Sequence, residues 1–120
     1  MRMWLVNPKF MCKQHLLGEH NELHKIVGCI NKDRSLEGFY KNGMMDTTQI
    51  IKRHQDLVNE MTKRGYNHKS PLPSFTDPIR GFVDSHRNFK ELINRCLECE
   101  IIVDDEFYKL QHQNAGSQKC

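Results

Sequence analysis

The chain has 120 residues, of which 38% are hydrophobic and 28% charged, with a formal net charge of +3 and a mean hydropathy of −0.71. This length suits one domain with a core of its own, and no apolar run approaches the roughly 20 residues that a membrane span requires. The opening MRMWLVNPKF is a poor signal peptide, and five irregularly spaced cysteines indicate free thiols in a reducing cytoplasm rather than a disulfide framework.

The charge is uneven along the chain. Residues 1–70 contain 12 basic and 7 acidic side chains, a balance of +5, whereas residues 71–120 contain 6 and 8, a balance of −2. A basic first half suits a partner that carries phosphates, and a solvated surface of mixed charge explains it equally well.

The spacing of apolar residues predicts helices separated by long loops. The first helix is expected over residues 12–30, and residues 33–45 are expected to form a loop. The second helix is expected to run from caps at residues 46–48 to about Arg64, with Gly65 as its stop.

The second half of the chain begins with SPLPSFTDP, in which three prolines exclude a continuous helix. A third helix is expected from residues 84–85 to about Cys99, and the following IIVDDEFYKLQ is either a short strand or more helix. The end, HQNAGSQKC, suggests a loose tail. We therefore expect an all-α fold, a compact single domain of three main helices over residues 1–111, and a flexible tail over residues 112–120.

The stretch QHLLGEHNELHK divides into two faces on the first helix. At roughly 100° per residue, His15, Glu19 and Glu22 form one stripe, whereas His20 and His24 form a pair on another side. A carboxylate beside an apolar face is partly desolvated, which suits it to proton transfer, and a histidine one or two turns away can orient it. The simpler interpretation is that both glutamates lie in solvent.

The pair His20 and His24 does not match the helix of a zinc protease. That helix reads H-E-x-x-H, whereas here the string HNELH has its glutamate one place late and no third ligand at useful spacing. We therefore expect an exposed histidine pair and no metal.

The string CLEC places Cys96 and Cys99 at the expected end of the third helix rather than at a helix start. A lone C-x-x-C supplies two zinc ligands or a redox pair. Cys12, Cys29 and His86 would complete a metal site only if the fold brought them there, so buried or idle thiols are the expectation.

His54 falls within the apolar stripe of the second helix. It is therefore either a core residue or a residue that points into a site between helices. Lys52 and Arg53 flank it, where they could meet phosphates.

Three strings together resemble a known family. QHLLGEHNELHKIVG resembles the first helix of the pyrimidine-dimer DNA glycosylases of the phage endonuclease V type, whose pattern is Q-H-L-x-x-E-x-x-E-L-x-[KR]-[IV]-x-G at the same distance from the amino end. VNEMTKRGYN resembles the end of that family's next long helix, and MRMWLVNPKF is similar to the opening of bacterial and phage relatives. The resemblance covers roughly residues 1–70.

The resemblance implies that the α-amine of the chain is a nucleophile. The amine of Met1 would attack the anomeric carbon of a damaged nucleotide, expel the base and form an imine. Glu22 would then move protons and stabilise the ring-opened sugar for β-elimination. His15 matches the family's helix histidine near the site, and Arg2 matches its arginine beside the nucleophile. An α-amino group has an ordinary pKa of about 7.7 to 8.0, so a neutral amine is accessible near neutral pH.

The resemblance also implies contact with DNA. Asn21 and Lys25 lie where the family places basic groups against phosphates, with Asn21 in place of an arginine. His54 stands where the best-known members carry glutamine, and the aromatic-basic C-terminal segment of the family has no counterpart in residues 71–120.

We therefore expect a DNA-repair glycosylase with associated abasic-site lyase activity. The expected catalytic residues are Met1, Glu22, His15 and His54, and those expected against nucleic acid are Arg2, Asn21, Lys25, Lys52 and Arg53. Neither a metal nor another cofactor is expected. The expected partner is damaged double-stranded DNA, without a membrane, in the cytoplasm of a bacterium or a phage-infected host. Two alternatives stay open: a protein that binds or cleaves a nucleotide-sized ligand in the same pocket, and a non-catalytic helical interaction module.

Overall fold

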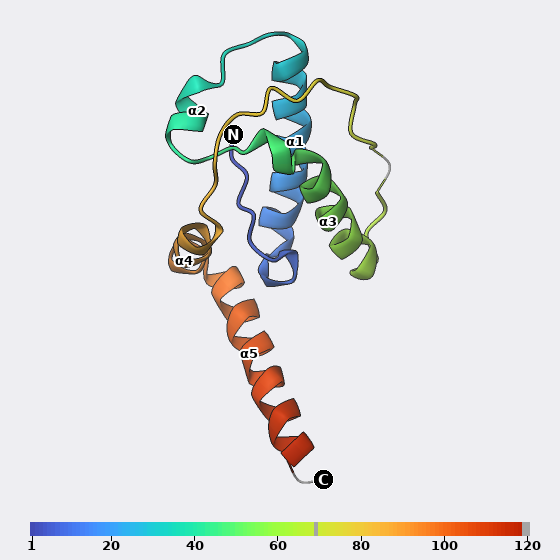
Figure 1. Cartoon of the computed structure of the whole chain (residues 1–120). Helices are drawn as coiled ribbons and strands as arrows, with labels where there is room; N and C mark the ends of the chain where they lie inside the picture. Colours follow the sequence, from blue (N-terminus) through green and yellow to red (C-terminus); the bar gives the residue numbers. More distant parts are fainter. Residues whose placement is uncertain (69, 119–120) are drawn as a thin grey trace.

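The computed structural model describes residues 1–68 and 70–118, with side chains described as far as Gln111. In these residues the chain forms five α-helices, two 3₁₀ turns and, in place of strands, a single bridge between Asp46 and Gly81 (Figure 1), which confirms the all-α class. The elements are η1 (Pro8–Phe10), α1 (Lys13–Asn31), α2 (Glu37–Lys41), η2 (Thr47–Gln49), α3 (Ile50–Lys63), α4 (Ser85–Arg95) and α5 (Leu97–Gln118). None of the described helices combines the length and the apolarity that crossing a membrane would require.

The core lies between α1, α3 and the extended segment that precedes η1. Leu16 and Leu23 on α1 and Leu57 on α3 have no exposed surface, and Met3 of the amino-terminal segment is equally buried. Each such side chain contributes roughly 1.5–3 kcal/mol through the apolar surface that it removes from water. The amino-terminal segment therefore belongs to the core, which fixes where the chain begins relative to α1.

Two of the predicted helices match the structure closely, the third begins at Ser85 as predicted, and the proline-rich stretch is non-helical as expected. The first was expected over residues 12–30 and spans Lys13–Asn31. The second begins as η2, where Asp46 accepts a hydrogen bond from the backbone of Thr48, and continues as α3. Residues 33–45 were expected to form a loop, and they contain the short helix α2.

The third helix is shorter than predicted, because Cys96 has extended dihedral angles (φ −126°, ψ 108°) that interrupt the helix after Arg95. A new helix, α5, starts at Leu97 and continues to Gln118, through part of the stretch expected to be a loose tail. The architecture thus has four longer helices and one short one within the described residues. Residues 119–120 of that expected tail lie outside the described residues.

A proline-rich loop returns the chain from α3 to α4 across the outside of the core. At Gly81, whose φ is +90°, an added Cβ would lie 2.0 Å from the backbone oxygen of Met45. Only glycine tolerates both this left-handed conformation and this close approach. Thr47 fixes the same loop, because its backbone N–H and its hydroxyl both donate to the carbonyl oxygen of Arg80.

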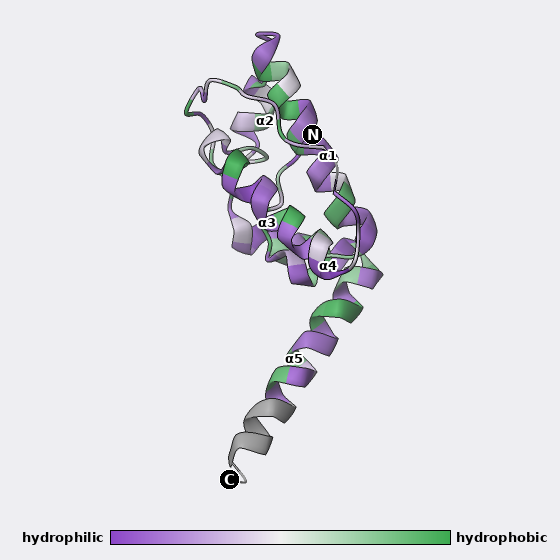
Figure 2. Cartoon of the chain, turned by 90° about the vertical axis from the view of Figure 1, so that its right-hand side faces the viewer, coloured by the Kyte–Doolittle hydropathy of each residue, from purple (hydrophilic) through white to green (hydrophobic). Residues whose placement is uncertain are grey.

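Helix α5 projects from the other helices, and the molecule measures 58 × 30 × 25 Å along its principal axes (Figure 1). Its beginning packs on α4 and η1, where Cys99 and Val103 are buried. Figure 2 shows hydrophobic and hydrophilic residues alternating along the coloured part of this helix.

Candidate active site at the amino terminus

The structure brings the first residue of the chain to the carboxylate that the sequence singled out. The amine nitrogen of Met1 lies 4.0 Å from Oε2 of Glu22 on α1, and the two side chains are 19% and 30% exposed. This Oε2 atom is buried and accepts no hydrogen bond from the described residues. The amine and the carboxylate therefore face each other in a partly shielded position.

The segment behind Met1 is fixed by hydrogen bonds from two directions. The backbone N–H of Met3 donates to the carbonyl oxygen of Met44 at 2.7 Å, and the buried amide of Asn88 on α4 donates to the carbonyl oxygens of Met3 and Trp4 at 3.4 and 3.0 Å. The amine of Met1 is thus at the end of an ordered segment, which lowers the entropic cost of presenting it to a substrate.

Arg2 is held by α4 as well. Its guanidinium donates to both carboxylate oxygens of Glu91, at 2.5 and 3.1 Å, and to the side-chain oxygen of Asn88 at 2.8 Å. It also lies 3.7 Å from the ring centroid of Trp4. These Arg2 contacts hold the pKa of the Glu91 carboxyl below its ordinary value, the hydrogen bond being the larger cause. In this structure Arg2 is a positioning residue for the segment, and its predicted phosphate contact stays a prediction.

Three polar residues expected against DNA lie at the surface. Asn21 and Lys25 are exposed on α1, one on each side of Glu22 in the sequence. Lys52 is exposed on α3 and forms an ion pair with Asp56 at 3.0 Å. Their placement is compatible with the predicted phosphate contacts.

Arg53, in contrast, is buried, which corrects its placement at a phosphate-binding surface. Its guanidinium donates to both carboxylate oxygens of Glu19, at 2.5 and 2.8 Å, and to the carbonyl oxygen of Val6 at 2.7 Å. The side chains of the pair are 4% and 0% exposed. The simpler interpretation of Glu19 as a solvated residue is therefore wrong as well: the pair ties α1, α3 and the amino-terminal segment together.

His54 lies away from Met1 and Glu22. Its ring contacts those of His20, His24 and His68, with centroids 4.9, 5.4 and 5.2 Å away. His20 and His24 occupy the side of α1 roughly opposite Glu22, since residues on a helix are separated by roughly 100° each. The expected support of Glu22 by His54 is thus not present in the structure, and the two expected surface histidines instead belong to a cluster of four.

Burial governs the protonation of this histidine cluster. Desolvation, followed by repulsion from His54, His24 and His68, lowers the pKa of His20 to about 4. Desolvation, then His24 and His68, also lowers the pKa of His54. Nε2 of His20 lies 2.9 Å from Nε2 of His68, so one ring donates to the other. Ligand atoms of His20, His54 and His68 lie within 4.8 Å of one another, a spacing that would also permit a metal ion.

His15 lies in a different environment from the one the sequence suggested. Its Nδ1 is 3.2 Å from the sulfur of Cys12, and its ring meets the edge of Trp4 with centroids 5.7 Å apart. Desolvation, followed by the charges of Arg95 and Arg2, lowers its pKa. His15 therefore touches Trp4, whose ring stacks on Arg2, and its expected catalytic role stays a prediction.

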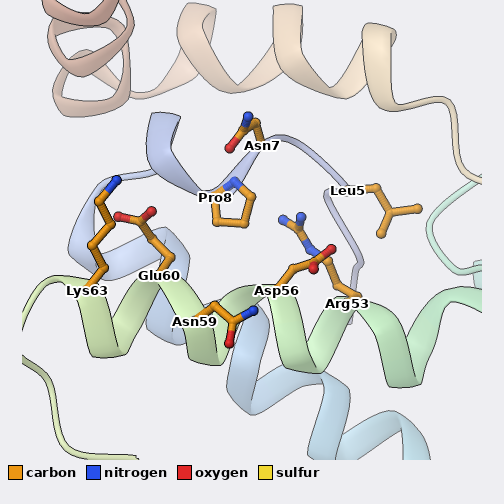
Figure 3. Close-up of a pocket in the computed structure, with 8 residues that line it drawn as sticks. All are labelled: Leu5, Asn7, Pro8, Arg53, Asp56, Asn59, Glu60 and Lys63. Atoms are coloured by element: carbon orange, nitrogen blue, oxygen red, sulfur yellow. The ribbon is translucent and has the colours of Figure 1, made fainter.

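The described surface also holds pockets, and their lining residues are distinct from the pair of Met1 and Glu22. Figure 3 shows one of about 470 Å³ between the amino-terminal segment and α3. Its lining residues are Leu5, Asn7, Pro8, Arg53, Asp56, Asn59, Glu60 and Lys63. Another, of about 670 Å³, lies between α3 and the proline-rich loop and includes His54, Leu72 and Phe75.

Sequence reasoning missed the residues of α4 that hold the amino terminus, Asn88 and Glu91, and the meeting of His15 with three cysteines. Asn88 carries no local signal, because an asparagine on a helix is usually solvated. The cysteines did carry one, namely C-x-x-H at the start of α1 and C-x-x-C farther along the chain.

The chain is thus all-α, and its amino-terminal amine faces a carboxylate on its first long helix. The sequence profile of the pyrimidine dimer DNA glycosylase family matches residues 1–74, more than half of the chain, and the chain belongs to this family. Family membership supports DNA glycosylase activity on DNA that contains pyrimidine dimers. Comparison with curated proteins and with solved structures gave no match.

Proposed function

We propose that this protein is a DNA glycosylase with associated abasic-site lyase activity, in which the amine of Met1 is the nucleophile and Glu22 the acid/base residue. The observation that supports it most directly is the 4.0 Å separation between the amine and the carboxylate. Damaged double-stranded DNA is the proposed substrate, and the cytoplasm of a bacterium or a phage-infected cell is the proposed location.

In the proposed reaction, the neutral amine forms a bond to the anomeric carbon while the bond from that carbon to the base breaks. The base leaves with the electron pair and takes a proton from a nearby acid. Loss of the ring oxygen's bond to the same carbon then gives an imine. Glu22 removes a proton from the adjacent sugar carbon, which expels the 3′ phosphate by β-elimination, and water finally releases the amine.

The surroundings of the pair suit this chemistry. Asn88 and Glu91 hold the segment that carries Met1, so the amine is already oriented. Asn21 and Lys25, on either side of Glu22 in the sequence and exposed, are the proposed contacts with phosphates. Reaching the anomeric carbon requires the DNA to be bent or the nucleotide to be unstacked.

Borohydride trapping tests the proposal directly, since the reagent reduces an imine to a stable amine and leaves protein covalently bound to DNA. We expect the wild-type chain to be trapped on DNA with an abasic site and on irradiated DNA, and peptide mapping to locate the adduct at Met1. A chain whose α-amine is acetylated should not be trapped. An adduct on a lysine, or none at all with a free amine, would reject Met1 as the nucleophile.

Substituting Glu22 separates proton transfer from imine formation. Glu22→Gln should slow strand cleavage by roughly 10²–10⁴-fold, the usual contribution of a positioned acid/base group. Glu100→Gln, at an exposed position on α5, serves as the matched control and should cleave as the wild type does. Equal cleavage by both variants would contradict the role of Glu22, whereas absence of cleavage by the wild type itself would favour a non-catalytic interaction module.

A nucleotide-sized ligand is the second candidate substrate, and one observation favours it. The pocket of about 670 Å³ beside His54 has the volume of a small-molecule site and carries an aromatic ring, Phe75, and a basic side chain, Lys52. Saturable binding of a free nucleotide, weakened by Phe75→Ala but not by Phe82→Ala, would support this function over DNA repair. Phe82 is an exposed aromatic residue outside that pocket.

A further inference from the structure

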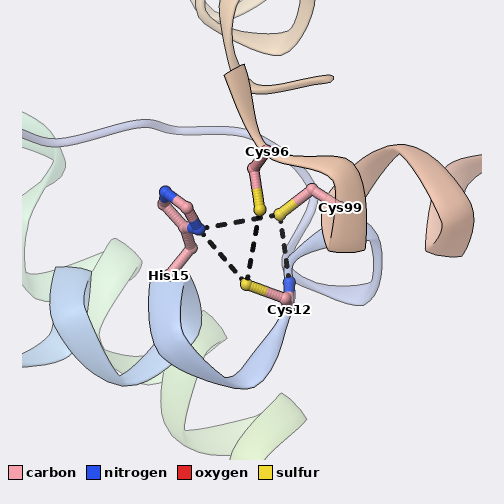
Figure 4. A group of neighbouring side chains, drawn as sticks. All are labelled: Cys12, His15, Cys96 and Cys99. Carbon is pink, nitrogen blue, oxygen red and sulfur yellow. Dashed lines mark hydrogen bonds between the residues drawn. The ribbon is translucent and has the colours of Figure 1, made fainter. Parts of the chain in front are cut away.

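Four potential metal ligands, from the start of α1 and the start of α5, lie close together (Figure 4). They are Cys12, His15, Cys96 and Cys99, and their ligand atoms all lie within 4.8 Å of one another. The sulfur of Cys12 lies 3.2 Å from Nδ1 of His15 and 3.9 Å from the sulfur of Cys96, and the sulfur of Cys99 lies 3.8 Å from the same Nδ1. Figure 4 shows the four side chains directed toward a common centre.

Three of the six separations between these ligand atoms are close to those of a tetrahedral site. With Zn–S bonds of about 2.3 Å and Zn–N bonds of about 2.0–2.1 Å, the edges of a tetrahedron are about 3.8 Å between two sulfurs and about 3.5 Å between sulfur and nitrogen. The sulfur–sulfur distance of 3.9 Å is close to the first of these values. The sulfur–nitrogen distances of 3.2 and 3.8 Å lie on either side of the second. A disulfide would require two sulfurs at about 2.05 Å, far closer than this pair.

Both halves of the cluster lie at the start of a helix. Cys12 is the residue before α1, and His15 lies in the first turn of that helix. The second half repeats this arrangement, because the break at Cys96 starts α5 and places Cys99 in its first turn. The backbone N–H groups at a helix amino terminus stabilise nearby negative charge, although burial raises the pKa of the Cys99 thiol to about 12. The expectation that CLEC ends a helix was therefore wrong, and the corrected position is the one typical of metal and redox pairs.

Contacts around the ligands orient them as supporting groups in zinc sites do. The backbone N–H of Cys12 donates to the sulfur of Cys99 at 3.2 Å in a buried position. The ring of His15 rests against the edge of Trp4, which fixes its rotation. Cys12 and Cys99 are 2% and 0% exposed, so a bound ion would be protected from solvent on their side.

We propose that Cys12, His15, Cys96 and Cys99 bind one zinc ion in a closed site with four protein ligands. The set Cys₃His, with no open position, is the one found in structural rather than catalytic zinc sites. The ion would join the start of α1 to the start of α5. Helix α5 packs against α4, and α4 holds the amino-terminal segment. The bound ion would therefore stabilise the position of Met1 without being part of the proposed active site.

Metal analysis of the full-length chain tests the proposal, and it does so without any assay of DNA repair. Protein purified without chelators should contain about one zinc per chain. After chelation under reducing conditions, cobalt should restore the site and produce the charge-transfer absorption of thiolate ligands in a tetrahedral field. Cys99→Ser and Cys12→Ser should lose zinc affinity by more than the 10–100-fold that removal of a supporting contact costs.

Cys29→Ser is the matched control, because Cys29 lies on α1 outside the cluster and should leave zinc content unchanged. His15→Cys keeps four ligands, so it should retain zinc and increase the thiolate absorption of the cobalt form, even if a serine variant unfolds. Absence of zinc together with absence of the cobalt spectrum, or equal zinc in Cys29→Ser and Cys99→Ser, would overturn the proposal. A loss of 2 Da in the unreduced chain without bound metal would assign the thiols to a disulfide instead.

Discussion

Two neighbouring basic residues on α3, Lys52 and Arg53, contribute differently to stability because only Arg53 is buried. Lys52 is 75% exposed and pairs with Asp56 one turn away, whereas Arg53 is 4% exposed and pairs with Glu19, 34 positions away. An exposed pair contributes little because water screens it. A buried pair is different, since loss of either member leaves an uncompensated charge in the core.

We expect Arg53→Ala to lower the free energy of unfolding by about 3–5 kcal/mol, because it leaves the carboxylate of Glu19 unpaired in the core. Urea unfolding followed by circular dichroism would measure it. Lys52→Ala, one residue away, is the control and should cost less than about 1 kcal/mol. A double variant, Arg53→Met with Glu19→Leu, should recover much of the loss. A cost of Arg53→Ala as small as that of Lys52→Ala would show that the pair contributes nothing.

The histidine cluster makes stability depend on pH. The pKa of His20 is about 4 in the folded chain and about 6.5 when unfolded, so the unfolded chain binds the proton first as the pH falls. Above about pH 6.5, His20 is neutral in both the folded and the unfolded chain, so its protonation does not reduce stability. Between about pH 6.5 and pH 4, the unfolded chain is protonated first, so the free energy of unfolding falls progressively. We therefore expect the melting temperature to fall across this window.

The contribution of His20 can be isolated with a variant that does not titrate there. His20→Gln should show a smaller decrease in melting temperature between pH 7 and pH 4 than the wild type, whereas His86→Gln, at an exposed position on α4, should match the wild type. Titration of the His20 ring by NMR gives the same information directly. A ring that protonates near its ordinary pKa of about 6.5 would contradict the prediction.

At the scale of elements, α4 positions the amino terminus even though it lies outside the 74 residues that match the family. Asn88 and Glu91, one turn apart on this helix, meet the backbone of Met3 and Trp4 and the guanidinium of Arg2. The position of the amino terminus, and with it the proposed active site, therefore depends on residues from both halves of the chain.

Removing one of these contacts tests the dependence. Asn88→Ala should lower the free energy of unfolding by about 1–3 kcal/mol, because it leaves buried carbonyl oxygens without a donor. Amide hydrogen exchange in the amino-terminal segment should accelerate, and borohydride trapping should become slower while its pH optimum stays unchanged. Asn94→Ala, exposed on the same helix, should change neither. Faster exchange in both variants would assign the effect to α4 as a whole.

The parts of the fold that the sequence predicted are those with strong local signals. Periodic apolar residues defined α1 and α3 to within a few positions, but α2 has only five residues and no usable period. The break at Cys96 was not predictable, because helical periodicity continues across it and the interruption is a matter of backbone angles.

The candidate site divides in the same way. Glu22 was predicted through the resemblance of its helix motif, which lies at a fixed distance from Met1, because helical periodicity alone left Glu19 and Glu22 undecided. The burial of Arg53 was not, since it depends on a partner on another helix. The thiol cluster joins residues 84 positions apart, and only the packing of α5 beside α1 brings them together.

At the scale of the whole molecule, the basic charge of the first half is now partly accounted for within the protein. Arg2 pairs with Glu91, Arg53 with Glu19 and Arg64 with Glu60. Among the cations still exposed, Lys25 and Lys52 are proposed contacts with DNA. The number of these contacts determines how strongly salt should weaken the complex, since each phosphate contact releases condensed counterions.

We expect the affinity for a duplex with a pyrimidine dimer to fall steeply with salt, with a log–log slope of about −0.9 for each phosphate contact. Lys25→Ala should weaken binding at every salt concentration and make the slope shallower by about one contact, because Lys25 lies beside Glu22 on the exposed side of α1. Lys109→Ala, on the projecting part of α5 where Lys109 pairs with Asp105, is the control and should leave the slope unchanged. Fluorescence anisotropy at several salt concentrations measures both. A wild-type affinity for DNA that barely responds to salt would instead favour the nucleotide-sized ligand.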